Sequence, residues 1–248
     1  MTGLLALLGG REHGPGCEPI DRMVLEATGR PDPLVAVVPL ASSLRTRART
    51  VGRAVGWWDE LGATTVVAGP DPEATRHLLD RADIVVLPGG VPDRLHERLL
   101  GGGLAAHLVA RWQAGVHLVG SSSGAMVVGS DRQTVRPPFA VRPGFGLLPN
   151  VAVAPHHELT VPRTVAAWRA RTHPHTVIVG IDEATGLVGR DGDFRVLGEG
   201  CVTVRRGAWV RVHRSGERID LRRLGIVPAD LPAAPTELAG RGGPQPVA

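Results

Sequence analysis

A serine occupies the centre of a Gly-x-Ser-x-Gly pattern that directly follows an apolar run. The run is Val116–Val119, and the pattern reads Gly-Ser-Ser-Ser-Gly at positions 120–124, with Ser122 at its centre. A buried strand that turns sharply into a helix at a serine is the setting of a nucleophile elbow, where small flanking residues permit a strained turn. The N-terminus of the following helix stabilises developing negative charge. The pattern predicts that Ser122 is a nucleophile, and an ordinary loop between strand and helix is the alternative.

A pair of glycines ends a second apolar run. Ile84–Leu87 is followed by Pro88, Gly89 and Gly90. In open α/β sheets, ligands bind in a crevice at the carboxyl ends of neighbouring parallel strands, and backbone N–H groups there can bind an oxyanion. We therefore predict that Gly90 and Ser123 contribute the N–H groups of an oxyanion hole. The alternative is a tight turn that uses glycine for its backbone freedom.

A histidine follows a third apolar run, downstream of the serine. Val151–Ala154 leads into Pro155, His156 and His157. In hydrolases with a nucleophile elbow the base follows the nucleophile along the chain. The two histidines point to opposite sides if the backbone stays extended, so we expect only one of them to act. A metal site built from His, His and Glu is disfavoured because adjacent side chains diverge, and we expect neither a metal nor an organic cofactor.

Six short segments together resemble one known family. Their residues and their order are similar to those of cyanophycinases and dipeptidase E, which belong to peptidase family S51. The resemblance implies the fold of class I glutamine amidotransferase domains, with serine at the elbow and His156 as the catalytic histidine. It also implies a small peptide or related amide as substrate, cleaved at an aspartyl or β-aspartyl residue. The segments are Gly9–Glu12, Val38–Ser42, Pro88–Gly90, Gly120–Ala125, Pro155–His157 and Gly180–Thr185.

The sequence departs from the family pattern at the acid that orients the histidine. The family places this acid between the nucleophile and the histidine, but no acidic residue occurs from Arg132 to His157. Asp131 is the nearest acid after the elbow, and Gly129 with Ser130 would allow the chain to reverse toward the histidine. We therefore predict that Asp131 orients His156. The other acids that could make this contact are Glu12, Glu158 and Glu183.

These residues predict a serine peptidase or amidase. Ser122 would form an acyl-enzyme with His156 as general base, and Arg163 and Glu183 are the residues that we expect to bind the substrate. Loss of the orienting acid costs a serine hydrolase about 10⁴-fold in rate. Because that acid is not evident, the alternative is a catalytically impaired amidotransferase-like module that binds a small ligand or a protein partner.

The elements that must position these residues alternate between strands and helices. The first apolar runs are continuous, as in strands buried on both faces of a parallel sheet. The clearest helix spans Leu44 to Leu61, with apolar residues at steps of three and four and Gly62 as its stop. We predict an α/β fold with a mainly parallel sheet flanked by helices, and the family resemblance implies that it is similar to class I glutamine amidotransferases and to flavodoxin. The runs are Leu4–Leu8, Leu34–Val38, Thr64–Ala68, Ile84–Leu87 and Val116–Val119.

After Thr176 short strands follow one another without intervening helices. Turn signals at Arg190–Asp193 and at Arg206-Gly207 separate them. We predict that these strands form an antiparallel hairpin extension at the C-terminus of the same domain. Residues 1–224 are expected to form a single α/β hydrolytic domain. Residues 225–248, which are rich in Pro, Ala and Gly, are expected to form a loosely ordered tail.

The composition is that of a globular protein. The chain has 248 residues, of which 43% are hydrophobic and 21% charged, with a net charge of +4. The arginines are scattered, which argues against nucleic acid as a partner, and no apolar run is long enough to span a membrane. The two cysteines form no disulfide framework, so we expect a reduced, cytoplasmic setting. A small peptide or amide is the expected partner, and a homodimer is left open.

Overall fold

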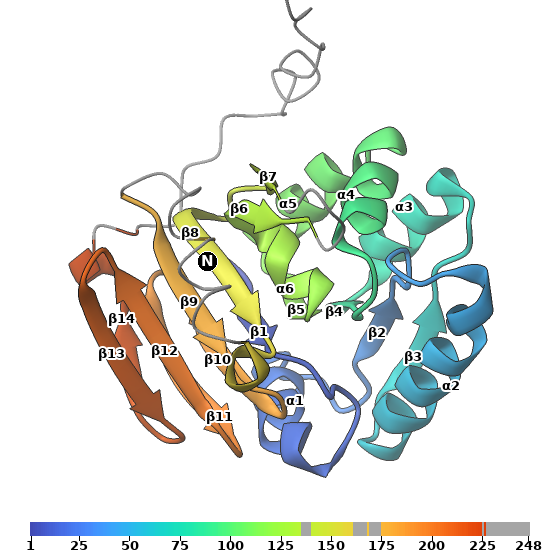
Figure 1. The fold of residues 1–248 in the computed structure, drawn as a ribbon. Helices are drawn as coiled ribbons and strands as arrows, with labels where there is room; N and C mark the ends of the chain where they lie inside the picture. Colours follow the sequence, from blue (N-terminus) through green and yellow to red (C-terminus); the bar gives the residue numbers. More distant parts are fainter. Residues whose placement is uncertain (135–139, 161–167, 169–174, 225, 227–248) are drawn as a thin grey trace, which may run out of the picture.

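Two β-sheets form the body of the protein (Figure 1). The computed structural model describes residues 1–134, 140–160, 168, 175–224 and 226. Within these residues the first sheet has eight strands in the order β14-β11-β10-β1-β5-β4-β2-β3. These strands are β1 (Leu5–Leu8), β2 (Leu34–Val37), β3 (Thr64–Val67), β4 (Ile84–Leu87), β5 (His117–Ser121), β10 (Thr185–Arg190), β11 (Asp193–Gly198) and β14 (Arg218–Asp220).

The five N-terminal strands of the first sheet are parallel. β1 pairs with β5, β5 with β4, β4 with β2 and β2 with β3, all in parallel register. Every residue of β1, β4 and β5 is buried, as continuous apolar runs covered on both faces should be. β10, β11 and β14 extend the sheet in antiparallel register. The predicted α/β fold with a mainly parallel sheet is confirmed.

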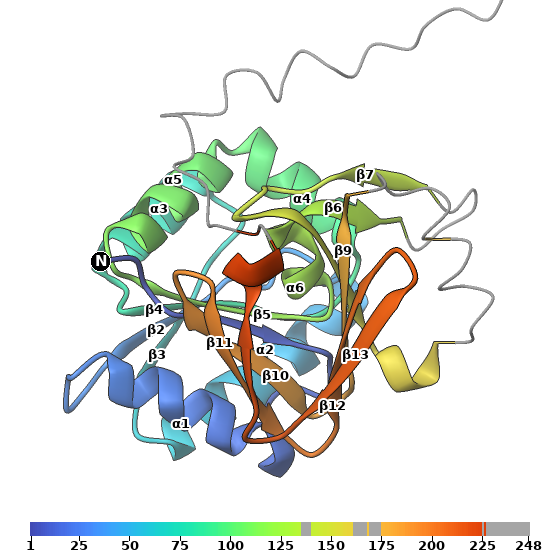
Figure 2. The same ribbon diagram turned by 90° about the vertical axis from the view of Figure 1, so that its left-hand side faces the viewer.

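Helices cover both faces of this sheet (Figure 2). α1 and α2 pack on the face that carries Leu4, Ala6 and Leu8, while α3 to α6 pack on the face that carries Leu5 and Leu7. The helices are α1 (Glu18–Ala27), α2 (Leu44–Glu60), α3 (Pro72–Arg81), α4 (Pro92–Gly101), α5 (Leu104–Gln113) and α6 (Ser123–Val128), and the 3₁₀ turns are η1 (Pro15–Cys17), η2 (His157–Leu159) and η3 (Leu221–Leu224).

The longest of these helices, α2, shows how the sequence sets its ends. Ser43 caps the N-terminus, accepting a hydrogen bond from the Thr46 N–H while the Thr46 hydroxyl accepts one from the Ser43 N–H. Gly62 follows the C-terminus with a φ of 93°, which favours glycine. The helix predicted from Leu44 to Leu61 is confirmed to within one residue, and it buries Ala54 and Trp58 against the sheet.

The second sheet was not predicted from the sequence. In the described chain it has six strands in the order β13-β12-β9-β8-β6-β7, and it packs on the same face of the first sheet as α3 to α6. β9 runs parallel to β8, and β8 runs parallel to β6. The strands are β6 (Gly129–Gln133), β7 (Val141–Pro143), β8 (Leu148–Pro155), β9 (Val177–Ile181), β12 (Cys201–Arg206) and β13 (Trp209–Arg214).

The strands after Thr176 are divided between the two sheets. β10, β11 and β14 join the first sheet, whereas β9, β12 and β13 join the second. The predicted hairpins are present, with Asp191 and Gly192 at positive φ in one turn and Gly207 in the other, as two-residue hairpin loops require. β9 pairs antiparallel with β12, as expected, but it also pairs in parallel with β8, and the strands form no single extension. Strand periodicity shows which residues are buried and not which strand lies beside them.

Two further sequence expectations meet the limits of the described chain. The segment 225–248 lies outside the described residues except for Ile226, which is buried. Among the residues that the structure describes, no helix is both long and apolar enough to cross a membrane.

Candidate active site

Ser122 stands at the turn between β5, a strand of the first sheet, and α6 (Figure 1). Its backbone has φ 50° and ψ −109°, a conformation that is costly for a residue with a side chain. The flanking glycines make the turn possible. A Cβ on Gly120 would lie 2.7 Å from the backbone of Gly124, and a Cβ on Gly124 would lie 2.0 Å from the carbonyl oxygen of Leu87. The strained turn predicted for Ser122 is therefore present.

His156 meets Ser122 from the second sheet. It follows β8 in the left-handed conformation, with φ 52° and ψ 41°, and its Nε2 lies 2.9 Å from the Ser122 Oγ. Its backbone N–H donates to the Gly9 carbonyl at 2.8 Å, which ties the end of β8 to the loop after β1. Gly10 leaves room for the ring, because a Cβ there would lie 2.3 Å from the His156 Cε1.

His157 points away from Ser122. Its ring packs against Gly180 of β9, where a Cβ would come within 2.5 Å of it. Burial lowers the pKa of His157 as the largest influence, with the nearby Asp182 acting in the opposite direction. Of the two adjacent histidines that the sequence offered, only His156 reaches the serine.

Glu183 binds the other ring nitrogen of the histidine. Its Oε1 lies 2.8 Å from the His156 Nδ1, with 39% of the histidine side chain and 23% of the glutamate side chain exposed. Glu183 belongs to the connection between β9 and β10, and its backbone N–H donates to the Glu158 Oε2 at 3.1 Å. The Arg11 Nε lies 3.9 Å from the Glu183 Oε2. Ser122, His156 and Glu183 thus form a continuous hydrogen-bonded chain.

Asp131 does not take the position predicted for it. It lies on β6, where its Oδ2 accepts a hydrogen bond from the Thr176 hydroxyl at 2.8 Å. β6 runs beside β8 with Asp131 opposite Ala152, so four residues separate that level from His156, or about 13 Å of extended strand. The chain continues from α6 into a strand and does not double back. Glu183, and not Asp131, is the acid in hydrogen-bonding contact with His156.

Of the two residues that were expected to bind the substrate, the structure describes only Glu183. Arg163 lies outside the described residues. Glu183, which was expected to bind substrate, has one carboxylate oxygen committed to His156. The sequence had offered Glu183 as one of three further acids for the contact with His156, and it lies two residues after the end of β9.

The two residues predicted to provide oxyanion donors lie in segments that adjoin Ser122. A Cβ on Gly89 would lie 3.3 Å from the Ser122 Cβ, so the glycine turn after β4 is in contact with Ser122. The neighbouring Gly90 has φ 151°, and a Cβ there would lie 2.6 Å from the carbonyl oxygen of Ala41. Ser123 is the first residue of α6, where a helix has N–H groups without partners of its own.

Glu12 lies beneath this turn and was not predicted from the sequence to contribute to it. Its Oε1 accepts from the Gly89 N–H at 2.9 Å, and its Oε2 accepts from the Ser121 hydroxyl at 2.8 Å. Burial, the largest influence, acts to raise the pKa of Glu12, but these two hydrogen bonds, a bond to its own backbone N–H and the nearby His13 together lower it, so the carboxylate is charged at neutral pH. The site therefore contains a fixed negative charge below the glycine turn.

Acidic and histidine side chains of this kind can also serve as metal ligands. In the described part of the chain, however, no group of three or more His, Cys, Asp or Glu side chains is placed to hold a metal ion.

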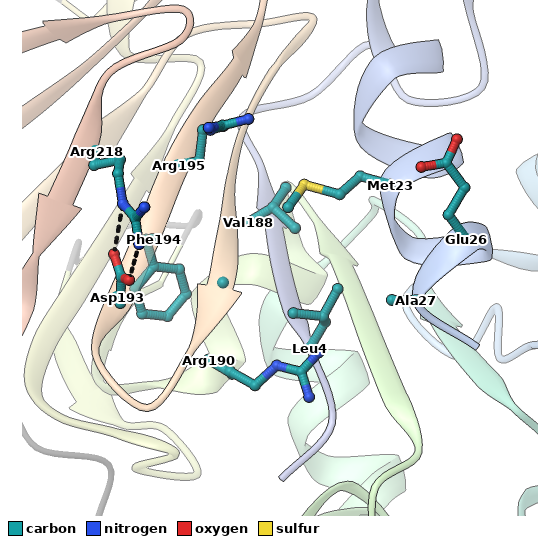
Figure 3. A pocket seen from close by; sticks show the side chains of 11 residues that line it. Leu4, Met23, Glu26, Ala27, Val188, Arg190, Asp193, Phe194, Arg195 and Arg218 are labelled. Carbon is teal, nitrogen blue, oxygen red and sulfur yellow. Dashed lines mark hydrogen bonds and ion pairs between the residues drawn. The ribbon is translucent and has the colours of Figure 1, made fainter. Parts of the chain in front are cut away.

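A separate pocket lies at the opposite end of β1 (Figure 3). It has a volume of about 540 Å³, and Leu4 at the start of β1 lines it, whereas the carbonyl of Leu8 at the other end binds the Ser122 N–H. The Asp193–Arg218 ion pair closes one side of the pocket, and Phe194 and Met23 contribute apolar surface. The pocket is thus distinct from the site at Ser122.

Both the sequence and the fold are similar to those of known proteins. The model of peptidase family S51 matches residues 4–197. A crystal structure of a peptidase from an acI-B1 Actinobacterium is 25% identical, with a TM-score of 0.79, and the match covers 89% of this chain and 97% of that one. A putative peptidase E from Listeria monocytogenes EGD-e shares the fold at 15% identity and a TM-score of 0.58, with 86% and 99% covered. No curated protein matches this chain.

Proposed function

Because the chain belongs to peptidase family S51, we propose that it is a serine hydrolase that cleaves a small peptide or related amide through Ser122. One observation carries the proposal. The Ser122 Oγ lies 2.9 Å from the His156 Nε2, and the His156 Nδ1 lies 2.8 Å from Glu183. A nucleophile within reach of a base that is itself held by a third group is the arrangement that activates a serine.

Acylation follows from this geometry. The Ser122 Oγ attacks the carbonyl carbon of the scissile amide while the His156 Nε2 takes the hydroxyl proton. The carbonyl oxygen becomes an oxyanion, which the N–H groups of Gly90 and Ser123 bind. When the C–N bond breaks, His156 donates its proton to the leaving amine, and the acyl group remains on Ser122 as an ester.

Deacylation repeats these steps with water. His156 removes a proton from a water molecule as the oxygen attacks the ester carbonyl, and it then returns the proton to the Ser122 Oγ as the acid product leaves. During both steps Glu183 accepts a hydrogen bond from the Nδ1–H, so it holds the neutral ring in the useful tautomer and stabilises the imidazolium that forms.

The proposed substrate carries an acidic residue, in the form of an Asp-X dipeptide or a β-aspartyl linkage. Support comes from the resemblance of the site segments to cyanophycinases and dipeptidase E. It also comes from Arg11, whose side chain is 68% exposed and lies beside Glu183, where it can meet a substrate carboxylate. Hydrolysis of Asp-X dipeptides compared with matching Asn-X and Leu-X dipeptides tests this selectivity.

The alternative, a catalytically impaired binding module, rests on the acid-free stretch of sequence before His156. Glu183 in hydrogen-bonding distance of His156 favours the active hydrolase over that alternative. A fluorophosphonate probe separates the two, since it reacts with an activated serine and not with a passive one. We expect labelling of the native protein, none in Ser122→Ala, and retained labelling in Ser123→Ala, which keeps its backbone N–H. Persistent labelling of Ser122→Ala would refute the choice of nucleophile.

A further inference from the structure

The carboxylate of Glu12 makes two hydrogen bonds to groups that adjoin the nucleophile. One joins it to the Gly89 N–H at 2.9 Å and the other to the Ser121 hydroxyl at 2.8 Å. Neither bond involves the side chains of the Ser122, His156 and Glu183 chain. Glu12 comes from the loop after β1, whereas its partners stand at the ends of β4 and β5. One side chain therefore connects three segments around the serine.

The bond to Gly89 decides which backbone donor is left for a substrate. The Gly89 N–H is occupied by Glu12, whereas within the described residues the Gly90 N–H makes no hydrogen bond. The Gly90 φ of 151° and its close approach to Ala41 restrict the same turn from the other side. Removal of the Glu12 carboxylate would leave the Pro88–Gly89 peptide, whose rotation also moves the Gly90 N–H, with the longer bond of 3.5 Å from the Ser123 hydroxyl to the Pro88 carbonyl.

The bond to Ser121 holds the turn between β5 and α6, which carries the second donor. Ser121 is the last residue of β5 and immediately precedes the strained Ser122, so its hydroxyl fixes the start of the turn that presents the Ser123 N–H. A carboxylate is suited to this place because it only accepts hydrogen bonds, and both of its partners donate. A neutral glutamine would have to turn one N–H toward a donor or rotate the Ser121 hydroxyl.

We propose that Glu12 is a positioning residue of the oxyanion hole, which holds the glycine turn after β4 in register with the elbow after β5. The inference rests on the proposed function only in assigning the oxyanion to the Gly90 and Ser123 N–H groups. Its effect belongs to the transition state, because the donors must meet the charge that develops on the carbonyl oxygen. Substrate binding in the ground state should depend on Glu12 far less.

The test compares Glu12→Gln with two controls. Glu18→Gln removes an exposed glutamate of α1 that pairs only with Arg22 in the described chain, and Ser121→Ala removes one of the two Glu12 bonds. Removing an oxyanion donor costs about 10²- to 10³-fold in kcat, so displacing one by Glu12→Gln should lower kcat and the rate of fluorophosphonate labelling by about 10- to 100-fold. KM should change less than about threefold, Ser121→Ala should show a smaller loss, and Glu18→Gln none.

A second measurement does not depend on activity. Hydrogen exchange of the Gly89 amide should be slow in the native protein and at least about 10-fold faster in Glu12→Gln, because its acceptor is weakened. Unchanged exchange, or labelling and kcat equal to the native values, overturns the positioning role. A native protein that never reacts with the probe overturns the proposed function instead, and the Gly89 exchange rate still decides whether Glu12 holds the turn.

Discussion

At the scale of single residues, the proposed mechanism depends on the contact between His156 and Glu183. Glu183→Gln keeps the size of the side chain and removes its charge, so the imidazolium loses its stabilising partner. We expect kcat to fall by about 10²- to 10⁴-fold, with KM changed much less. Steady-state hydrolysis of an aspartyl p-nitroanilide measures both constants.

Asp131→Asn is the matched control for this experiment. The native Asp131 carboxylate binds Thr176, and Asp131 pairs with Ala152, four residues before His156 on β8. The kcat of the variant should therefore stay within about threefold of the native value. A large loss in Asp131→Asn together with no loss in Glu183→Gln would contradict the assignment and restore the prediction made from the sequence.

The outcome shows which residues a sequence reveals. Ser122 and His156 each follow a recognisable apolar run, and the local pattern was enough to propose them. The third position depends on how strands far apart in the chain pair with one another. Asp131 was chosen for its closeness in sequence, but β6 carries it away from the end of β8, whereas Glu183 arrives through the parallel pairing of β9 with β8.

At the scale of elements, the loop after β1 provides the space in which the histidine ring sits. Gly10→Ala would place a methyl group 2.3 Å from the His156 Cε1 at a residue with φ 133°. We expect at least a 100-fold loss of kcat and a stability cost of about 1–3 kcal/mol. Gly14→Ala in the same loop has φ −157° and no contact closer than 3.7 Å, so it should keep native activity. Activity assays and urea denaturation of both variants give the answer.

Full activity of Gly10→Ala would mean that the ring can leave this position without penalty. The hydrogen bond between His156 Nε2 and Ser122 would then be unnecessary for turnover, and the proposed mechanism would lose its main support.

The elements themselves were more predictable than their arrangement. α2 was predicted almost to the residue from its apolar spacing and its terminal glycine, and the structure adds the Ser43 cap at its start. β10 and β11 were predicted as a hairpin for a similar reason, since Asp191 and Gly192 suit the turn. The second sheet could not be predicted, because the sequence of β9 does not indicate that β8 is the strand beside it.

At the scale of the whole molecule, the buried Asp21 links stability to pH. Burial raises its pKa to about 7, and the hydrogen bond from the Trp57 indole at 2.8 Å lowers it only in part. An unfolded aspartate has a pKa near 3.9. Between about pH 4 and pH 7 the unfolded chain therefore binds fewer protons than the folded one, and stability falls as the pH rises.

Asp21→Asn should remove this dependence, since asparagine is never charged and its carbonyl can still accept from Trp57. The free energy of unfolding of the variant minus that of the native protein should therefore be about 2–3 kcal/mol larger at pH 8 than at pH 5. Denaturant titrations at the two pH values measure the difference. Parallel pH dependence in the two proteins would show that Asp21 is already ionised when folded.

The catalytic chain draws on both sheets. Ser122 ends a strand of the first sheet, His156 ends a strand of the second, and Glu183 lies where the polypeptide crosses from one to the other. The three residues are separated by 34 and 27 positions along the chain, and contacts between distant segments form late in folding. A polypeptide still being synthesised or only partly folded has the serine without its base. Ser122 can therefore be activated in the proposed way only after both sheets have formed.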